Sequence, residues 1–176
     1  MTNIDIRDRI LDAAEARARR GGYNGFSYRD LAEDVGIKSS SVHYHYPSKP
    51  LLAEALMQRY TQRAQERLGV ASDVSAEEAV DRVTAMFRDA LVQDDRMCLC
   101  GLFGAQRDEL PPEVAAAVAG FFQYILDYLR TALAGETAFG TPESLLAKLE
   151  GALILARSLR SADTFEAAIG WRPARA

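Results

Sequence analysis

Residues 27–49 read SYRDLAEDVGIKSSSVHYHYPSK, and this stretch decides the fold that the chain is expected to adopt. Ser27 suits the cap of a helix, and Asp30 follows it at the spacing of a capping box. Gly36 stands where that helix must end and the chain must reverse, because glycine alone enters the left-handed backbone region without a steric penalty. The sequence therefore predicts a short helix, a glycine turn and a second short helix.

The second short helix has an unusual composition. Residues 38–46 hold three serines, one lysine, two histidines and two tyrosines, and Val42 is their one aliphatic residue. Such a segment makes a poor core helix but a good polar surface. A polar helix held across a turn from a packed helix is the arrangement of a helix-turn-helix, in which the first helix positions and the second reads DNA. A solvated turn between two core helices would have the same composition, so the pattern alone leaves both interpretations open.

A third helix is expected to begin directly after this pair. Ser48 can cap it, and Pro50 is tolerated in its first turn because the N–H at that position has no partner within the helix. Lys49 lies beside the unpaired N–H groups of this helix start, where a cation suits a phosphate oxygen. The helix is expected to continue to about residue 68, with Leu51 and Leu56 on its apolar side.

The rest of the chain also shows helical periodicity. Apolar residues recur at helical spacing before the pair Gly21-Gly22 and again beyond Gly69. The expected helices cover residues 5–21, 76–94, 111–134 and 141–161. The predicted fold class is therefore all-α, with an N-terminal three-helix helix-turn-helix domain and a C-terminal helical domain.

The last two long helices are more apolar than one small lobe requires, and Gly151 and Ala152 would let another helix approach closely. Two interpretations fit these apolar stripes equally well, an intramolecular core and the interface of a homodimer. A DNA-binding mechanism favours the dimer, because two recognition helices must lie about 34 to 36 Å apart to enter successive major grooves.

Composition and charge agree with a globular two-lobe protein. The chain of 176 residues is 48% hydrophobic and 26% charged, with a net charge of -4. Residues 1–68 hold 11 Lys and Arg against 9 Asp and Glu, so the remainder carries the negative charge, as expected when one lobe faces DNA. No segment reaches the roughly 18 apolar residues of a membrane span, and the N-terminus lacks the apolar run of a signal peptide. A cytoplasmic protein without a membrane partner is expected.

The first third of the chain resembles the DNA-binding domain of the TetR family of one-component transcriptional repressors. That family has a first helix of about fifteen residues, a capped helix with Leu-Ala-x-x-x-Gly-Val, and a polar helix of the form Leu-Tyr-x-(His/Tyr)-Phe-x-x-Lys. The matching elements here are residues 5–21, residues 31–37 (LAEDVGI) and residues 42–49 (VHYHYPSK). His43 replaces the usual tyrosine, and Lys38 replaces the usual serine or threonine cap.

The resemblance implies both the domain organisation and the DNA contacts. It implies a DNA-binding domain at residues 1–49, a connecting helix at 48–68 that transmits ligand binding, and an effector-binding and dimerisation domain at 69–176. The partner implied is a palindromic double-stranded DNA operator. The implied DNA-binding residues are Ser27, Tyr28, Lys38, Ser39, Ser40, Ser41, His43, Tyr44 and Lys49.

The segment around the two cysteines is the second informative stretch. Residues 97–104 read MCLCGLFG, which resembles the Gly-Cys-Leu-x-Gly-x-Leu helix start of TetR regulators that answer reactive electrophiles. Cys98 matches the cysteine of that motif, whereas Met97 replaces its glycine and Cys100 is additional. A thiol at a helix N-terminus has a lowered pKa and forms the nucleophilic thiolate more readily, so Cys98 is a candidate sensor. Packing as a small hydrophobe is the alternative for Cys98 and the favoured interpretation for Cys100.

Aromatic content and topology together predict an effector pocket in the second lobe. A small-molecule or electrophilic effector bound there would stabilise the state whose recognition helices are mis-spaced, and would thereby release the operator. The residues expected to line this pocket are Phe87, Cys98, Cys100, Phe103, Phe121, Phe122, Tyr124 and Tyr128.

Other classes of function find less support in the sequence. His43 and His45 are two residues apart, as are Cys98 and Cys100, and this spacing converges on one face only in a strand. No metal site is therefore expected, and a metal-responsive regulator is a minor alternative. No phosphate loop, nucleophile elbow or paired carboxylates indicate an enzyme or a cofactor. The alternative from another class is a helical ligand-binding protein that does not contact DNA.

Overall fold

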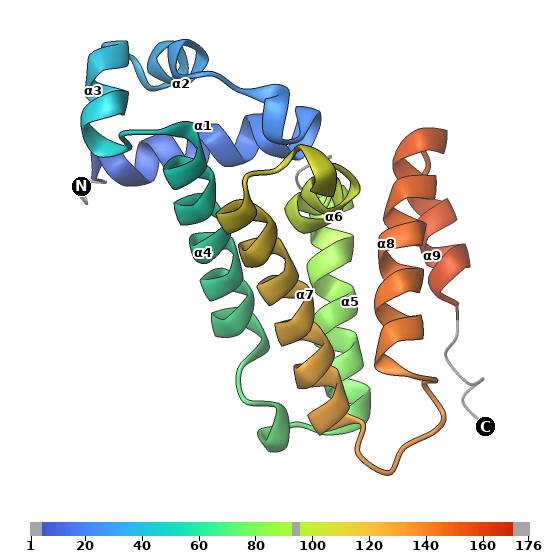
Figure 1. Ribbon diagram of the computed structural model, residues 1–176. Coiled ribbons are helices and arrows are strands. Elements are labelled where there is room, and N and C mark those ends of the chain that lie inside the picture. The colour runs from blue at the N-terminus through green and yellow to red at the C-terminus, as the bar shows by residue number, and fades with distance from the viewer. Residues whose placement is uncertain (1–4, 93–95, 171–176) are drawn as a thin grey trace. The chain divides into compact units, whose positions relative to one another are not determined.

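The computed structural model describes residues 5–92 and 96–170, and within these ranges every element is a helix (Figure 1). The α-helices are α1 (Ile6–Gly21), α2 (Tyr28–Val35), α3 (Ser39–His45), α4 (Lys49–Leu68), α5 (Ala76–Val92), α6 (Leu99–Ala105), α7 (Pro112–Ala132), α8 (Pro142–Leu159) and α9 (Ala162–Ile169). Three short 3-10 helices join them, η1 (Tyr23–Gly25), η2 (Ala71–Asp73) and η3 (Arg107–Glu109). The predicted all-α fold class is confirmed.

The chain forms two compact units that are interleaved along the sequence. The first consists of Met1–Gln62 and Leu99–Phe121, and the second of Arg63–Cys98 and Phe122–Ala176. The long helices α4 and α7 therefore contribute residues to both units. The predicted DNA-binding and effector domains are instead consecutive in sequence, and that functional division stays a prediction.

The start and end of α2 follow the sequence signals. The Ser27 hydroxyl accepts the Asp30 N–H at 3.3 Å, and the Asp30 carboxylate accepts the Ser27 N–H at 2.9 Å, which completes the predicted capping box. Gly36 ends the helix in the left-handed conformation, with φ 72°. The helix α3 then begins at Ser39 and ends at His45, so the predicted helix, turn and helix are confirmed.

In the first unit, α1 is held against α4 by apolar packing and by one arginine. Ile10 of α1 and Leu56 of α4 are fully buried. The largely buried Arg59 side chain of α4 reaches three carboxylates of α1 and lies 2.9 Å from Asp12 and 3.5 Å from Glu15. Removing one partner from such a cluster leaves buried charge without compensation, so Arg59 specifies how α4 is oriented on α1.

The second unit is built on α5, α8 and α9 together with the C-terminal parts of α4 and α7. The carbonyl oxygen of Leu68 accepts hydrogen bonds from Arg82 at 2.7 Å and from the Tyr128 hydroxyl at 3.1 Å, which fixes the end of α4. The guanidinium of Arg88 on α5 pairs with Glu166 on α9 through two hydrogen bonds, at 2.6 and 3.0 Å.

Two expectations from the sequence need correction, and one helix was not predicted. Leu51 does not lie on the apolar side of α4 but is 47% exposed. The last long helix ends at Leu159 instead of residue 161, because Arg160 adopts a left-handed conformation with φ 50°. A separate helix that the sequence did not predict, α9, follows and buries Phe165. The expected helix at residues 76–94 ends at Val92, and its last two positions lie outside the described residues.

None of the helices in the described ranges is long and apolar enough to cross a membrane.

The glycine turn can be tested by a substitution whose only effect is conformational strain of the backbone at Gly36. Gly36→Ala is expected to lower the free energy of unfolding by about 1 kcal/mol, because alanine is strained at positive φ. A methyl group at this position would meet no atom within 4 Å, so packing adds nothing to the cost. Gly21→Ala is the matched control, since Gly21 has equal space without a positive φ. Urea unfolding followed by circular dichroism measures both, and equal losses in the two variants would contradict the assignment.

Candidate functional site

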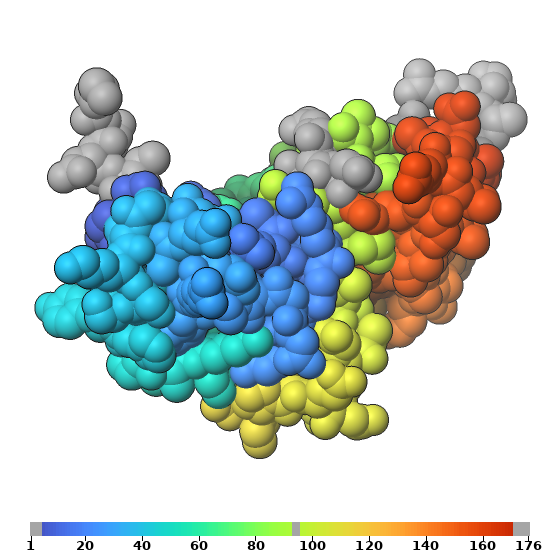
Figure 2. Space-filling model, turned by 90° about the horizontal axis from the view of Figure 1, so that it is seen from above, coloured from blue at the N-terminus to red at the C-terminus, as the bar shows by residue number. Residues whose placement is uncertain are grey.

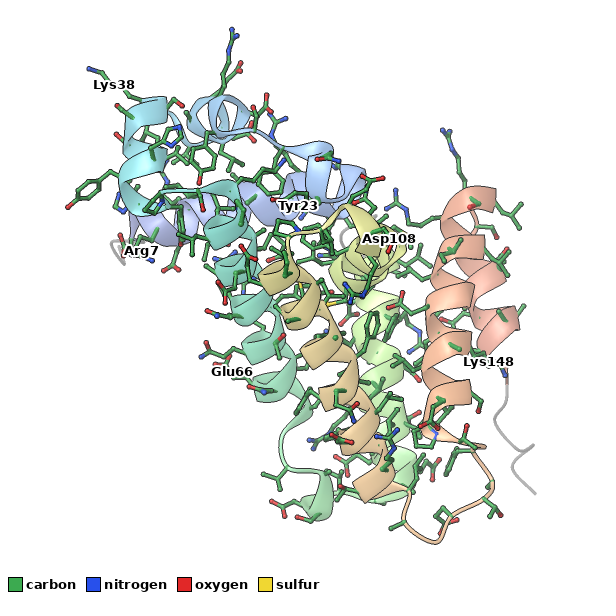
Figure 3. All side chains as sticks on the ribbon, in the orientation of Figure 1. Arg7, Tyr23, Lys38, Glu66, Asp108 and Lys148 are labelled. Atoms are coloured by element: carbon green, nitrogen blue, oxygen red, sulfur yellow. The ribbon has the colours of Figure 1, made fainter. Side chains whose placement is uncertain are left out.

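The face of α3 that is turned to solvent is polar. Lys38, Ser40, His43 and Tyr44 are exposed, and the Tyr44 side chain is 83% exposed. On the opposite side of the helix Val42 is fully buried and anchors it. Figure 2 shows that α2 and α3 lie at the surface when the molecule is viewed from above, and Figure 3 shows Lys38 extending away from the start of α3.

The structure places Tyr28 beneath this face. Its hydroxyl donates to the carbonyl oxygen of Tyr46 at 2.6 Å, and only 9% of the residue is exposed. Burial raises the pKa of Tyr28 to about 12, so the hydroxyl stays a neutral donor. The Tyr28 ring lies 4.3 Å from the imidazole of His43, measured between ring centroids. Tyr28 therefore supports α3 from within and is not part of the exposed set.

Lys49 lies at the start of α4, and its ammonium is held by two aromatic rings. Its Nζ is 4.7 Å from the centroid of the Tyr23 ring and 4.7 Å from that of Phe26. A cation at this distance over an aromatic face is attracted by the quadrupole of the ring. Partial burial lowers the pKa of Lys49. Of the other predicted DNA-binding residues, Ser27 is exposed, and Ser39 and Ser41 are half-buried.

Most arginines of α1 and α4 in the first unit are engaged inside the unit. Arg17 donates to the Asp34 carboxylate at 2.5 and 2.9 Å, which raises the pKa of Arg17 and lowers that of Asp34. Arg9 donates to the carbonyl oxygen of Val35 at 2.6 Å. By contrast, Arg29 on α2 is exposed close to Ser27, and the sequence analysis did not assign it. A cation two residues after a helix cap is the signal that could have identified it.

The residues predicted for the effector pocket are divided between the two units. Cys100, Phe103 and Phe121 belong to the first unit, and the other five to the second. Phe103 packs edge-on against Tyr23, with ring centroids 6.0 Å apart, and Phe121 packs against Tyr60 at 5.5 Å. Three surface hollows described in the structure have other linings. Arg157 and Arg160 at the end of α8 line the first hollow, Thr141 before the start of α8 lines the second, and Arg17 on α1 lines the third.

Both thiols are buried. Cys98 directly precedes α6 and is 3% exposed, and Cys100 within α6 is fully buried. Glu150 of α8 places its two carboxyl oxygens in the interior beside Cys98. Burial, followed by the charge of Cys98 and its hydrogen bond, raises the pKa of Glu150 to about 10, so this carboxyl is protonated at neutral pH. No group of three or more His, Cys, Asp or Glu residues in the part of the chain that the structure describes is arranged to hold a metal ion.

A packed helix, a left-handed glycine and a short helix with an exposed polar face define a helix-turn-helix DNA-binding protein. Residues 10–56 match the family model described as "Bacterial regulatory proteins, tetR family". A TetR transcriptional regulator from Legionella pneumophila is 30% identical, with a TM-score of 0.86 and 97% of each chain covered. A TetR family regulator from Agrobacterium tumefaciens is 29% identical, with a TM-score of 0.86 and 93% of each chain covered. The chain belongs to the TetR family of transcriptional regulators, as the resemblance predicted.

A curated relative matches a shorter part of the chain. The Staphylococcus aureus protein IcaR, named as an HTH-type negative transcriptional regulator of the biofilm operon icaADBC, is 37% identical over 49 residues. The match covers 28% of this chain and 26% of IcaR, so the chain spans about a quarter of that relative's length. Members of the TetR family are regulators and not enzymes, bind DNA operators as dimers and often bind small-molecule effectors.

The buried carboxyl predicts a pH dependence of stability. In the unfolded chain Glu150 loses its proton near the ordinary pKa of 4.5, whereas the folded protein holds this proton up to about 10. The folded state therefore binds more protons within that window, and its stability falls as pH rises through it. Glu150→Gln cannot ionise and should show a weaker fall in its urea midpoint. Glu77→Gln, at an exposed site, is the control, and parallel curves for the wild type and Glu150→Gln would contradict the prediction.

Proposed function

We propose that this protein is a transcriptional repressor that binds a palindromic operator as a homodimer through residues 27–49. One observation carries the proposal: α3 presents Lys38, Ser40, His43 and Tyr44 to solvent while Val42 anchors it in the core. A helix that exposes hydroxyl, imidazole and ammonium groups and buries one small apolar residue can enter the major groove without losing its support. The negative regulation named for IcaR supports repression by this chain.

The exposed side chains fall into two proposed roles. His43 and Tyr44 lie on the exposed side of α3 and can hydrogen-bond base edges, so we assign them to sequence recognition. The serines at 39–41 are short donors that allow the helix backbone close to phosphates, with Lys38 beside them. Lys49 contacts a phosphate from the start of α4. Tyr28 contributes by holding α3 in place instead of by touching DNA.

An apolar surface on α8 supports dimer formation. Ile154 is 52% exposed, Leu155 51% and Leu159 65%, although each would be more stable away from water. These residues lie at helical spacing on one side of α8. A Cβ added at Gly151, on the same helix, would meet no atom within 4 Å, so another helix has room to approach there. We propose that this surface packs on its copy in the homodimer.

For release from the operator we propose a small molecule that binds without forming a covalent bond. Cys98 is 3% exposed and lies beside the protonated carboxyl group of Glu150. An electrophile would therefore meet a thiol that is shielded from solvent. The effector is expected to bind preferentially to the state in which the two recognition helices are wrongly spaced for the operator. We place the protein in the cytoplasm, where such an operator lies.

The DNA-binding role is tested with a fluorescent duplex from upstream of the protein's own gene and a scrambled duplex of equal length. Wild type is expected to prefer the upstream duplex, and affinity for both should fall with salt. His43→Ala should lose about 1 to 3 kcal/mol of discrimination, because it removes a contact to a base edge. Lys38→Ala should weaken binding to both duplexes alike.

His45→Ala serves as the control for His43, since His45 is half-buried on the same helix. The proposed function would be excluded if wild type bound neither duplex, or if it bound both equally and without any dependence on salt. Titrating a thiol-reactive maleimide against wild type and Cys98→Ser separates the two modes of release. If the maleimide releases wild type from the duplex but does not release Cys98→Ser, the trigger is the thiol and not a non-covalent ligand.

The dimer surface is tested by placing a charge in it. Leu155→Asp is expected to shift the protein towards monomer in analytical ultracentrifugation, because a carboxylate would be buried without a partner. Its operator affinity should fall by more than tenfold, since one recognition helix then binds alone. Val70→Asp introduces the same charge at a residue that is 61% exposed outside α8. Dimerisation of Leu155→Asp at wild-type strength would exclude this surface.

A further inference from the structure

The α6–η3 segment, residues 99–109, packs against η1 in the same compact unit as the helix-turn-helix. The side-chain oxygen of Gln106 accepts the backbone N–H of Tyr23 at 2.8 Å. One residue further on, the amide of Asn24 donates to the Glu109 carboxylate at 3.1 Å. Two adjacent residues of η1 are thus held by two side chains that lie more than eighty positions later in sequence. Figure 1 shows α6 close to the loop that follows α1.

The position of Gln106 depends on a close approach to Gly22. A Cβ at Gly22 would lie 2.0 Å from the side-chain oxygen of Gln106 and 2.6 Å from its Cδ. Gly22 also has φ 68°, a conformation that disfavours any other residue. The backbone of Gln106 is itself fixed, because its N–H donates to the carbonyl oxygen of Phe103 at 3.0 Å. Gln106 therefore occupies one defined place at the end of α1.

Tyr23 connects this contact to the ammonium of Lys49. Its ring is 8% exposed and packs edge-on against Phe103 on α6 and against Phe26, with centroids 6.0 and 6.5 Å apart. The ammonium of Lys49 lies over the Tyr23 and Phe26 rings together. Gln106 holds the backbone of Tyr23, and Phe103 packs on the edge of its ring. The Tyr23 ring therefore has little freedom to turn. The place of the Lys49 ammonium is thus defined by residues outside the helix-turn-helix.

We propose that Gln106 is a positioning residue for DNA binding, which acts through Tyr23 to hold the Lys49 ammonium where it meets an operator phosphate. The inference rests on the proposed function, because it concerns the phosphate contact assigned to Lys49. Gln106 itself does not contact DNA but acts through Tyr23 and Lys49. A lysine fixed before binding loses less conformational entropy when it meets the phosphate, so the aromatic pair raises the affinity by preorganisation.

The first test observes Lys49 without DNA. The chain holds three lysines, Lys38, Lys49 and Lys148, so ¹³C reductive methylation gives few signals. In wild type the Lys49 signal should be shifted by the two rings and should titrate below the ordinary range of a lysine ammonium, because burial lowers its pKa. Gln106→Met keeps the side-chain length but removes the acceptor. It should reduce the ring-induced shift of the Lys49 signal and move its titration towards the ordinary range of a lysine ammonium. Gln123→Met, at an exposed glutamine of α7, should leave them unchanged.

A second variant disturbs the same contact by a change at Gly22 instead of Gln106. Gly22→Ala places a methyl group where the Gln106 amide lies and should displace it, with the same effect on the Lys49 signal. Circular dichroism confirms that each variant is folded. An unchanged Lys49 signal in a folded Gln106→Met or Gly22→Ala protein would overturn the inference while leaving the proposed function intact.

The second test measures the phosphate contact on the scrambled duplex, where binding does not depend on the operator sequence. Each lost phosphate contact should lower the slope of log affinity against log salt by about 0.9. Lys49→Ala and Gln106→Met should lower the slope alike, and the double variant should lose no more than Lys49→Ala alone. A purely structural role would instead give additive losses in affinity with an unchanged slope, and that result would overturn the inference. If wild type bound no duplex at all, both the proposed function and this inference would be excluded.

Discussion

The hydrogen bond from the Tyr28 hydroxyl to the Tyr46 carbonyl oxygen is the contact on which the reading surface depends. The helix α3 has seven residues and buries one aliphatic side chain, Val42, so it is too short to be stable by itself. Tyr46 ends α3, and Tyr28 begins α2. The bond at 2.6 Å therefore joins the start of the positioning helix to the end of the recognition helix. Because it is buried, leaving the carbonyl oxygen unpaired would cost more than an exposed hydrogen bond contributes.

Charge in the first unit stabilises the unit more than it attracts DNA. Arg17 and Arg59 are paired with carboxylates, and Arg9 is bound to a backbone carbonyl oxygen. The remaining exposed cations near α3, Lys38 and Arg29 among them, are few for a protein that binds a polyanion. From this we infer a small non-specific electrostatic contribution to the proposed DNA binding. Neutral polar groups on α3 must then supply a larger share of the binding energy, which favours discrimination between sequences over tight binding to any duplex.

What the sequence predicted well depends on neighbouring residues, and what it missed depends on distant ones. The Ser27 cap and the Gly36 turn are local signals, and both were confirmed. The burial of Tyr28 and the aromatic neighbours of Lys49 arise from packing between elements, which spacing along one helix does not encode. Aromatic content likewise did not show that Phe103 packs on Tyr23. The sequence analysis did not single out Glu150, because a single carboxylate gives no sign of its burial or of its neighbour Cys98.

The end of the recognition helix and the residue that begins the next helix are therefore held by different means. At its end, Tyr46 is fixed by a hydrogen bond from Tyr28 within the helix-turn-helix. Just beyond it, Lys49 is fixed by rings whose own position depends on Gln106 in the α6–η3 segment. The first contact belongs to the element that binds DNA, so it cannot change without loss of the fold of that element. The second is made by a segment outside that element, so the position of Lys49 can change while α2 and α3 stay intact. Adjustment of affinity is thus more readily achieved through the proposed phosphate contact of Lys49 than through the side chains proposed to read bases.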